Sequence, residues 1–389
     1  MSSRLLIISL LYSTTVISVP FTPNNNDQVL EQLPKAANAI NKELRSLRDE
    51  LNTHPQQLDV AVQLAKRYIA VGKAEADPRY YGYAQGVLKP WWDKPEPASE
   101  VLLVRALILQ NRHDFANALR DLDSLLRREP DNAEAWLTQA IILQVTARYD
   151  EAQRSCLPLI TLDVPLVAST CLASLGSLTG QAEKSYVFLQ KTLNEAQKPT
   201  ADQQLWALTV LAEIATRIGK IKEAEQFFNA ALKVNGRDVY LLSAYSDFLL
   251  DQQRPADVIA LLADKTRIDG LFLRSVLAKQ QMADPKLVEL IAELQARFAA
   301  SYLRGENLHQ GDEARFTLHL LKQPQRALQL ALANWQVQRE PKDTRILLEV
   351  AIAEHNSVTA QPALDLLKTT GMESLVLKQL MQQLENKLP

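Results

Sequence analysis

The chain has 389 residues, with 43 Lys and Arg against 45 Asp and Glu, and only 11 of its residues are Gly. Leu, Ala, Gln, Glu, Lys and Arg, which favour helices, dominate the composition, and no stretch alternates the β-branched and aromatic residues of a half-buried strand. These features predict an all-α protein. They exclude a strongly basic nucleic-acid binder, for which we expect a basic excess on one face.

Residues 1–18 have the pattern of an export signal. Arg4 precedes an apolar run of about 15 residues, which is short for a membrane span, and Val16 and Ser18 lie where a signal peptidase could cut. We expect residues 1–18 to be a signal peptide and residues 19–33 a polar linker. The mature chain would then be periplasmic or secreted, with no integral membrane segment. The alternatives are an uncleaved anchor and a coding frame that starts too early.

Residues 34–56 predict an amphipathic helix. Its apolar residues alternate spacings of three and four, as in the seam of a coiled coil, and are Ala37, Ile40, Leu44, Leu47 and Leu51. Only about two and a half heptads are present, whereas a coiled coil needs three or four. We therefore expect an N-terminal capping helix that packs on the first helix pair of the fold.

Residues 57–97 predict a helix pair with an insertion. Leu64–Gly72 has the pattern of a first helix and Tyr80–Leu88 that of a second, and Lys73–Arg79 forms a lengthened turn between them. The Trp91–Trp92 pair that follows could stack on a sugar. We expect it instead to fill space beneath this helix pair.

Two later parts of the chain show internal repetition most clearly. They are Ala133–Leu137 with Arg148–Ala152, and Gly219–Leu232. Both resemble the tetratricopeptide repeat, in which a Trp or another large residue opens the first helix and a small residue opens the second. Trp136 has the place of that large residue in the first of the two parts. The resemblance implies an all-α fold, an α-solenoid in which antiparallel helix pairs stack into a right-handed superhelix.

Small residues mark the period along the chain. In second helices they stand at Ala118, Ala152, Ser185, Ala224, Ala256, Ala327 and Ala363, at intervals of 34, 33, 39, 32, 71 and 36 residues. The family period is about 34 residues, and the longest interval fits two units. In first helices they stand at Ala65, Ala106, Ala140, Ala173, Ala212, Ala244 and Ala351. Paired helices approach to roughly 8–10 Å, so we expect only a methyl group to fit where they cross.

This register divides the rest of the chain. We predict a variant repeat over 57–97, five repeats over 98–267, three degenerate repeats over 268–372 and a C-terminal capping helix over 373–389. Pro130 and Pro341 are expected to end second helices, because proline cannot continue the helical hydrogen-bond ladder.

No motif for catalysis or metal binding emerges. None of the five His has the spacing that places two ligands on one helix face, and although His309 and His319 could converge across a turn, we expect no metal there. The chain has no Gly-rich phosphate loop, and no serine lies in the strand–turn–helix context of a nucleophile. We predict that the protein is not an enzyme and holds no cofactor or metal.

The two cysteines predict a disulfide. Cys156 falls in the second helix of one repeat and Cys171 in the first helix of the next, and these helices should be antiparallel neighbours. In an oxidising compartment such a pair would be bridged. The alternative is two buried free thiols, since cysteine also serves as a small core residue. With the export signal, we expect the disulfide.

In the tetratricopeptide family the first helices line the concave side of the superhelix. The residues that the register places there are Gln110, Asn111, Gln144, Thr170, Ser174, Ser177, Thr209, Glu213, Arg217, Tyr245 and Phe248. The set by which some members clamp a terminal carboxylate is missing, because Leu137, Ile141 and Ser174 occupy the comparable positions. Tyr245 and Phe248 could equally pack between repeats.

From the resemblance we predict a non-catalytic interaction scaffold. It would bind a protein or peptide partner, and no nucleic acid, in the concave groove. The alternative is an accessory or enzymatic subunit of an envelope complex that uses the helix stack as a frame.

Overall fold

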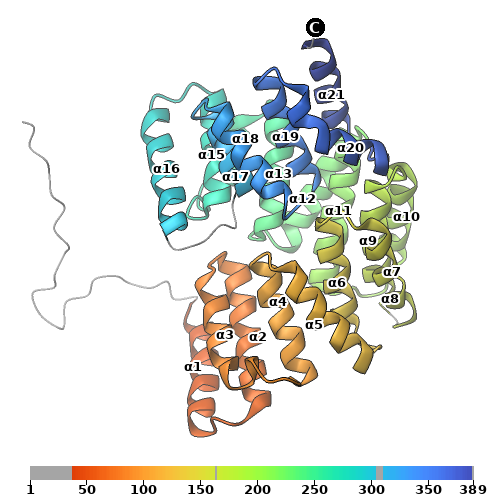
Figure 1. Cartoon of the computed structure of the whole chain (residues 1–389), viewed down its shortest axis with the longest axis vertical. Helices are drawn as coiled ribbons and strands as arrows, with labels where there is room; N and C mark the ends of the chain where they lie inside the picture. Colours follow the sequence, from red (N-terminus) through yellow and green to blue (C-terminus); the bar gives the residue numbers. More distant parts are fainter. Residues whose placement is uncertain (1–36, 163, 304–309, 388–389) are drawn as a thin grey trace, which may run out of the picture.

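The computed structural model describes residues 37–162, 164–303 and 310–387, and helices are the only regular secondary structure in these ranges (Figure 1). The first half contains α1 (Ala37–Thr53), α2 (Leu58–Glu75), α3 (Arg79–Trp92), α4 (Ser99–Asn111), α5 (Phe115–Arg128), α6 (Ala133–Val145), α7 (Tyr149–Cys156), α8 (Pro158–Thr161), α9 (Pro165–Leu178) and α10 (Ala182–Glu195). The second half contains α11 (Ala201–Arg217), α12 (Ile221–Val234), α13 (Val239–Asp251), α14 (Pro255–Leu261), α15 (Asp269–Gln281), α16 (Leu287–Leu303), α17 (Gln310–His319), α18 (Pro324–Trp335), α19 (Pro341–Ala353), η1 (Ser357–Ala360), α20 (Gln361–Thr370) and α21 (Leu375–Lys387). The predicted signal peptide and polar linker lie outside the described residues.

From α2 onwards the helices form antiparallel pairs. The first helices are α2, α4, α6, α9, α11, α13, α15, α17 and α19. Each packs against the helix that follows it, and each from α2 to α17 also packs against the first helix of the next pair. Each pair thus contacts its neighbours in a one-dimensional stack. The fold is an all-α solenoid, as the sequence predicts.

One residue in each turn between paired helices adopts a left-handed backbone conformation. These residues are Ala76, His113, Ala147, Gly180, Gly219, Gln253, Ala283, Lys322 and His355, with φ between 49° and 80°. Only two of them are glycine, so most of these turns have no glycine signal in the sequence. The shared conformation shows that the pairs from α15 to α20, which match the repeat pattern less well, turn in the same way.

The small residues lie where paired helices cross, with one exception. Ala118, Ala152 and Ala224 are completely buried, as close approach of the helices requires. In the pair α13–α14, however, Ala256 is exposed. Ser246 and Val258, two positions further along each helix, are the fully buried residues there. The predicted register of this pair was therefore wrong by two residues, because α14 begins only at Pro255.

The first pair, α2–α3, has a shorter turn than the sequence predicts. Helix α2 continues to Glu75 and α3 begins at Arg79, so the predicted insertion is mostly helical. Helix α3 then runs through Pro90 to Trp92. Helix α1 packs on α2 and buries Leu44 and Leu47, which is the contact that a capping helix makes.

Prolines limit helices in two ways. Helix α5 ends before Pro130, and α7 ends before Pro158, which starts the short helix α8. Pro341 is instead the first residue of α19, where its missing N–H has no helical partner to lose. The expectation that Pro341 ends a second helix was wrong, since α18 already ends at Trp335.

The C-terminal repeats of the solenoid contact its middle repeats. The amide of Arg339, just before α19, donates to the carbonyl of Val145 at the end of α6, at 2.8 Å. The carboxylate of Glu373 accepts from the amide of Ala182 at 2.6 Å, and Gly180 packs against the backbone of Gly371. The C-terminal repeats therefore cover the turns of the middle repeats, and one hydrophobic cluster contains residues of both.

Candidate interaction surface

The first helices form the inner wall of the solenoid, and a contact between α2 and α6 marks this wall near the N-terminus. Lys66 of α2 pairs with Glu134 of α6 at 3.2 Å, across the intervening helix α4. Such a contact is possible only on the concave side, where the faces of successive first helices converge. Both side chains are about half exposed, so we expect the pair to add little stability.

An open pocket of about 560 Å³ lies on this part of the inner wall. It is lined by Leu58, Asp59, Val62, Gln63 and Lys66 of α2 and by Glu100 of α4. Leu58 and Val62 are the more buried and form an apolar floor, whereas the polar side chains are exposed around it. Because the charge of Lys66 is met by Glu134, the remaining rim is acidic.

The predicted groove residues fall into two groups. Gln110 and Asn111 lie at the end of α4, Gln144 at the end of α6, and Glu213 and Arg217 near the end of α11, all partly exposed. Thr170, Ser174, Ser177, Thr209, Tyr245 and Phe248 are buried instead. The structure therefore brings only the first group to an accessible surface.

The two threonine hydroxyls of the buried group bond within their own helices. Thr209 donates to the carbonyl of Leu205 at 2.8 Å, and Thr170 to that of Leu166 at 2.7 Å. Bonds of this kind satisfy a hydroxyl where helices pack closely and no water is available. The expectation that Thr209 faces the groove needs correction, since it lies between helices.

Tyr245 and Phe248 also belong to the core. The ring of Tyr245 stacks on Phe228 of α12 with centroids 4.8 Å apart, and Phe248 lies 5.4 Å from the same ring. Six per cent of Tyr245 and two per cent of Phe248 are exposed. Of the two alternatives left open by the sequence, packing between helices is the one that the structure shows.

Glu213 and Arg217 belong to a polar cluster. The hydroxyl of Tyr240 donates to the carboxylate of Glu213 at 2.8 Å, and the guanidinium of Arg217 donates to Ser177 at 2.6 Å. Burial raises the pKa of Glu213, against the charge of Arg217 and the hydrogen bond from Tyr240. Tyr240 remains half exposed, so this cluster offers both a ring face and charged groups to a partner.

The cluster continues at the start of α19. Asp343 accepts from the amide of Glu340 at 2.9 Å and from the side chain of Asn334 at 2.8 Å. Burial raises the pKa of Asp343 to about 6, although the charge of Lys342 opposes the change. Glu340 in turn pairs with Lys342 at 2.9 Å.

Ion pairs join the inner helices of the C-terminal half. Asp247 of α13 accepts from Arg274 of α15 at 2.7 Å and from Arg315 of α17 at 2.5 Å. Burial alone would raise the pKa of Asp247, but the two arginines outweigh it and hold that pKa well below its usual range. This network positions the helices relative to one another and leaves no charge in it unpaired.

A second set of pairs reaches α19. Arg345 donates to Asp251 at 2.8 Å and to Glu349 at 2.7 Å, and Glu349 also bonds to His319 of α17 at 2.7 Å. Burial favours the neutral form of Glu349, but the bond from His319 and the charge of Arg345 lower its pKa to about 2. The sequence did not predict this network, because its hydrogen bonds join residues up to 94 positions apart.

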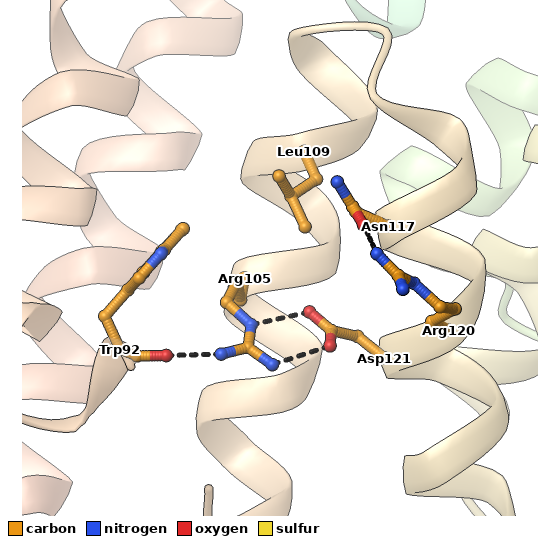
Figure 2. Close-up of a pocket in the computed structure, with 6 residues that line it drawn as sticks. All are labelled: Trp92, Arg105, Leu109, Asn117, Arg120 and Asp121. Atoms are coloured by element: carbon orange, nitrogen blue, oxygen red, sulfur yellow. Dashed lines mark hydrogen bonds and ion pairs between the residues drawn. The ribbon is translucent and has the colours of Figure 1, made fainter. Parts of the chain in front are cut away.

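The second pocket, of about 290 Å³, lies between α3, α4 and α5 (Figure 2). Arg105 spans it, with two hydrogen bonds to the carboxylate of Asp121 at 2.6 and 2.7 Å and a third to the carbonyl of Trp92. The charge of Arg105 is thus paired within the chain, and its hydrogen bonds link α4 to α3 and to α5. Trp91 is buried in the core and Trp92 lines the pocket.

A disulfide joins Cys156 of α7 to Cys171 of α9, with Cα atoms 5.9 Å apart. Within the described ranges, no three His, Cys, Asp or Glu side chains gather as metal ligands would. His319 instead pairs with Glu349, and His309 lies outside the described residues. In those same ranges, no helix has the length and apolarity to cross a membrane.

No protein-family model and no curated protein sequence matches this chain. Among solved structures, it is similar to a tetratricopeptide repeat protein from Parabacteroides merdae, with 16% identity, 74% of this chain and 99% of the other covered, and a TM-score of 0.31. It is also similar to a human IFIT1 dimer with PPP-AAAA (14% identity, 90% and 86% covered, TM-score 0.49) and to yeast Tom70 (11%, 90% and 85%, TM-score 0.40). At these identities the likeness concerns the fold alone.

Proposed function

We propose that this protein is a non-catalytic interaction scaffold that binds a protein or peptide partner on the inner wall of its solenoid. The observation that carries the proposal is the open pocket between α2 and α4. Its apolar floor of Leu58 and Val62 and its acidic rim of Asp59 and Glu100 have the make-up of a peptide-binding surface.

The ion pairs between the inner helices of the C-terminal half support binding rather than catalysis. Asp247 and Glu349 have strongly lowered pKa values, but arginine and histidine partners account for both. Paired networks of this kind stabilise helix packing without providing a free acid or base. The acidic rim also favours a protein or peptide over the phosphate backbone of a nucleic acid.

We also propose that the scaffold is exported to the periplasm or secreted. The apolar run behind Arg4 and the disulfide between Cys156 and Cys171 support this compartment. Mass spectrometry of the protein from its native host should find a chain that begins near Val19. A full-length chain in the cytosolic fraction would refute export but would leave the inner-wall site unaffected.

The binding proposal is tested by reversing the charge of the pocket rim. The double variant Asp59→Lys/Glu100→Lys should reduce partner capture from native envelope extract at least tenfold, because it replaces both rim carboxylates with cations. Both positions are exposed, so the fold should be unaffected. Glu195→Lys on the outer helix α10 is the matched control and should capture the partner as the wild type does. Undiminished capture by the double variant would refute the pocket as the site.

A further inference from the structure

Asp121 and Asp343 are the buried carboxylates of the described part of the chain, at 8% and 3% exposure. They differ in their partners. Asp121 accepts two hydrogen bonds from the guanidinium of Arg105. Asp343 accepts from neutral groups instead, the backbone amide of Glu340 at 2.9 Å and the side-chain amide of Asn334 at 2.8 Å. A buried carboxyl that is not paired with a cation favours its protonated form.

The charged groups around Asp343 leave it without a bound cation. Lys342, in the same turn of α19, pairs with Glu340 at 2.9 Å, and 59% of its side chain is exposed. Burial and the charge of Glu340 raise the pKa of Asp343 to about 6, against the charge of Lys342. The buried hydroxyl of Tyr149 in α7 feels the charges of Asp343, Glu340 and Arg217, and no described residue hydrogen bonds to it.

Helix α17 covers the pair of Asn334 and Asp343. A Cβ atom added at Gly311 would lie 3.3 Å from the carboxylate and 3.4 Å from the amide, and Asn334 is 5% exposed. Asp312, the charged neighbour of Gly311, pairs with Arg274 at 3.5 Å. An amide presents its N–H to a carboxylate and, turned over, its C=O to a carboxylic acid. Asn334 can therefore bond to Asp343 in both protonation states.

Asp343 lies beside the contact between the C-terminal and the middle repeats. The amide of Arg339, four residues earlier, donates to the carbonyl of Val145 in α6 at 2.8 Å. Tyr149 of α7 belongs to the same hydrophobic cluster as Trp335 of α18. The middle repeats thus supply part of the apolar surroundings of Asp343, and these surroundings are lost when the contact opens.

We propose that Asp343 is a proton switch at this contact, which closes more tightly when the carboxylate takes up a proton. In the closed contact, the ionised side chain is a buried charge without a cation, which is unfavourable. The protonated side chain is neutral, and it can donate to Asn334 while it accepts from the amide of Glu340. In the open contact, water solvates the carboxylate and removes the preference for the proton.

The contact should therefore tighten in acid. The pKa of Asp343 is about 6 in the closed contact, above its usual value of roughly 3.9 in a solvated chain. A carboxyl with a raised pKa stabilises the closed contact fully below the solvated value, and this contribution is lost as the pH rises through the closed value. With these two values, closing should be roughly tenfold more favourable at pH 5 than at pH 7.

Hydrogen–deuterium exchange of the purified full chain tests the switch at the amide of Arg339. Asp343→Asn mimics the protonated form, and comparing it with the wild type at the same pH cancels the intrinsic pH dependence of exchange. The ratio of exchange rates, wild type over variant, should be about tenfold larger at pH 7 than at pH 5. Asp365→Asn, at an exposed position on α20, is the matched control and should exchange as the wild type does at both pH values. An Asp343→Asn ratio that is the same at pH 5 and pH 7 would overturn the proposal.

Lys342→Gln tests the sign of the effect without changing the buried pair, because most of the Lys342 side chain is exposed. Removing this cation raises the pKa of Asp343 further, since the charge of Lys342 lowers it. Protection of the Arg339 amide, which the wild type loses up to about pH 6, should continue to fall at higher pH in this variant. Protection that ends at the same pH as in the wild type, or at a lower one, would overturn the role of Asp343 even if Asp343→Asn does not fold. The measurement needs no partner, so it is independent of capture on the inner wall.

Discussion

At the scale of single residues, burial separates packing from binding on the first helices. The sequence placed Tyr245, Phe248, Glu213 and Arg217 on one expected surface. In the structure, the two rings contact Phe228, whereas the two charged residues remain partly exposed. Sequence periodicity indicates on which side of a helix a residue lies. It does not show how much of that side chain the adjacent helices bury.

This distinction predicts opposite effects of two alanine substitutions. Tyr245→Ala should reduce the free energy of unfolding by roughly 3 kcal/mol or more, because it leaves a cavity beside Phe228. Arg217→Ala should cost about 1 kcal/mol, the loss of its hydrogen bond to Ser177. Urea denaturation followed by circular dichroism measures both. A Tyr245→Ala protein as stable as the wild type would show that the ring does not belong to the core.

At the scale of helices, small residues and turns determined how much was predictable. The alanine register indicated the helix pairs because each pair needs a close crossing between its two helices. It failed at α13–α14, where Ser246 and Val258 occupy the crossing, because Val258 is not a small residue and Ala244 and Ala256, two positions earlier, continue the alanine series. The turn conformations were not predictable from the sequence either, because residues such as Ala283 and Lys322 adopt the left-handed conformation without being glycine.

The ion pairs between inner helices make stability depend on pH. The pKa of Glu349 is about 2 in the folded protein, below its usual value of roughly 4.3 in an unfolded chain. A carboxyl with a lowered pKa stabilises the fold above the unfolded value, and this contribution is lost as the pH falls towards the folded value. Glu349 should therefore contribute roughly 2–3 kcal/mol at neutral pH, lost between about pH 4.5 and pH 2.

Urea denaturation of the wild type and Glu349→Gln across this pH range checks that prediction. The difference in their free energies of unfolding should be largest near neutral pH and should shrink as the solution is acidified. Asp257→Asn removes a half-exposed partner of Arg254 and is the control, with an expected cost below about 1 kcal/mol. A Glu349→Gln difference that is constant with pH would contradict the lowered pKa.

The disulfide is the covalent link between two consecutive repeats. It ties α7 to α9 across a break that Pro158 introduces, and both sulfur-bearing residues are buried. For a closed loop of 15 residues, the chain-entropy treatment gives roughly 3 kcal/mol of stabilisation. Thermal unfolding should therefore begin at a lower temperature with reductant present. Two titratable free thiols in the native protein would contradict the link.

At the scale of the whole molecule, the solenoid was predictable but its self-contact was not. Repetition over about 34 residues indicates neighbouring pairs, because each pair buries its apolar face on the next. The contacts of Arg339 with Val145 and of Glu373 with Ala182 depend on the pitch of the superhelix, which accumulates small rotations from every pair. The sequence pattern of a single repeat does not specify this accumulated rotation.

The central claim is that a partner binds the inner wall, and site-specific photo-crosslinking tests it most directly. A photoreactive phenylalanine analogue at Gln63, in the pocket between α2 and α4, should form a covalent adduct with a protein of the native envelope. The same analogue at Glu195, on the outer helix α10, should form none. Adducts from Glu195 without any from Gln63 would contradict the inner-wall site.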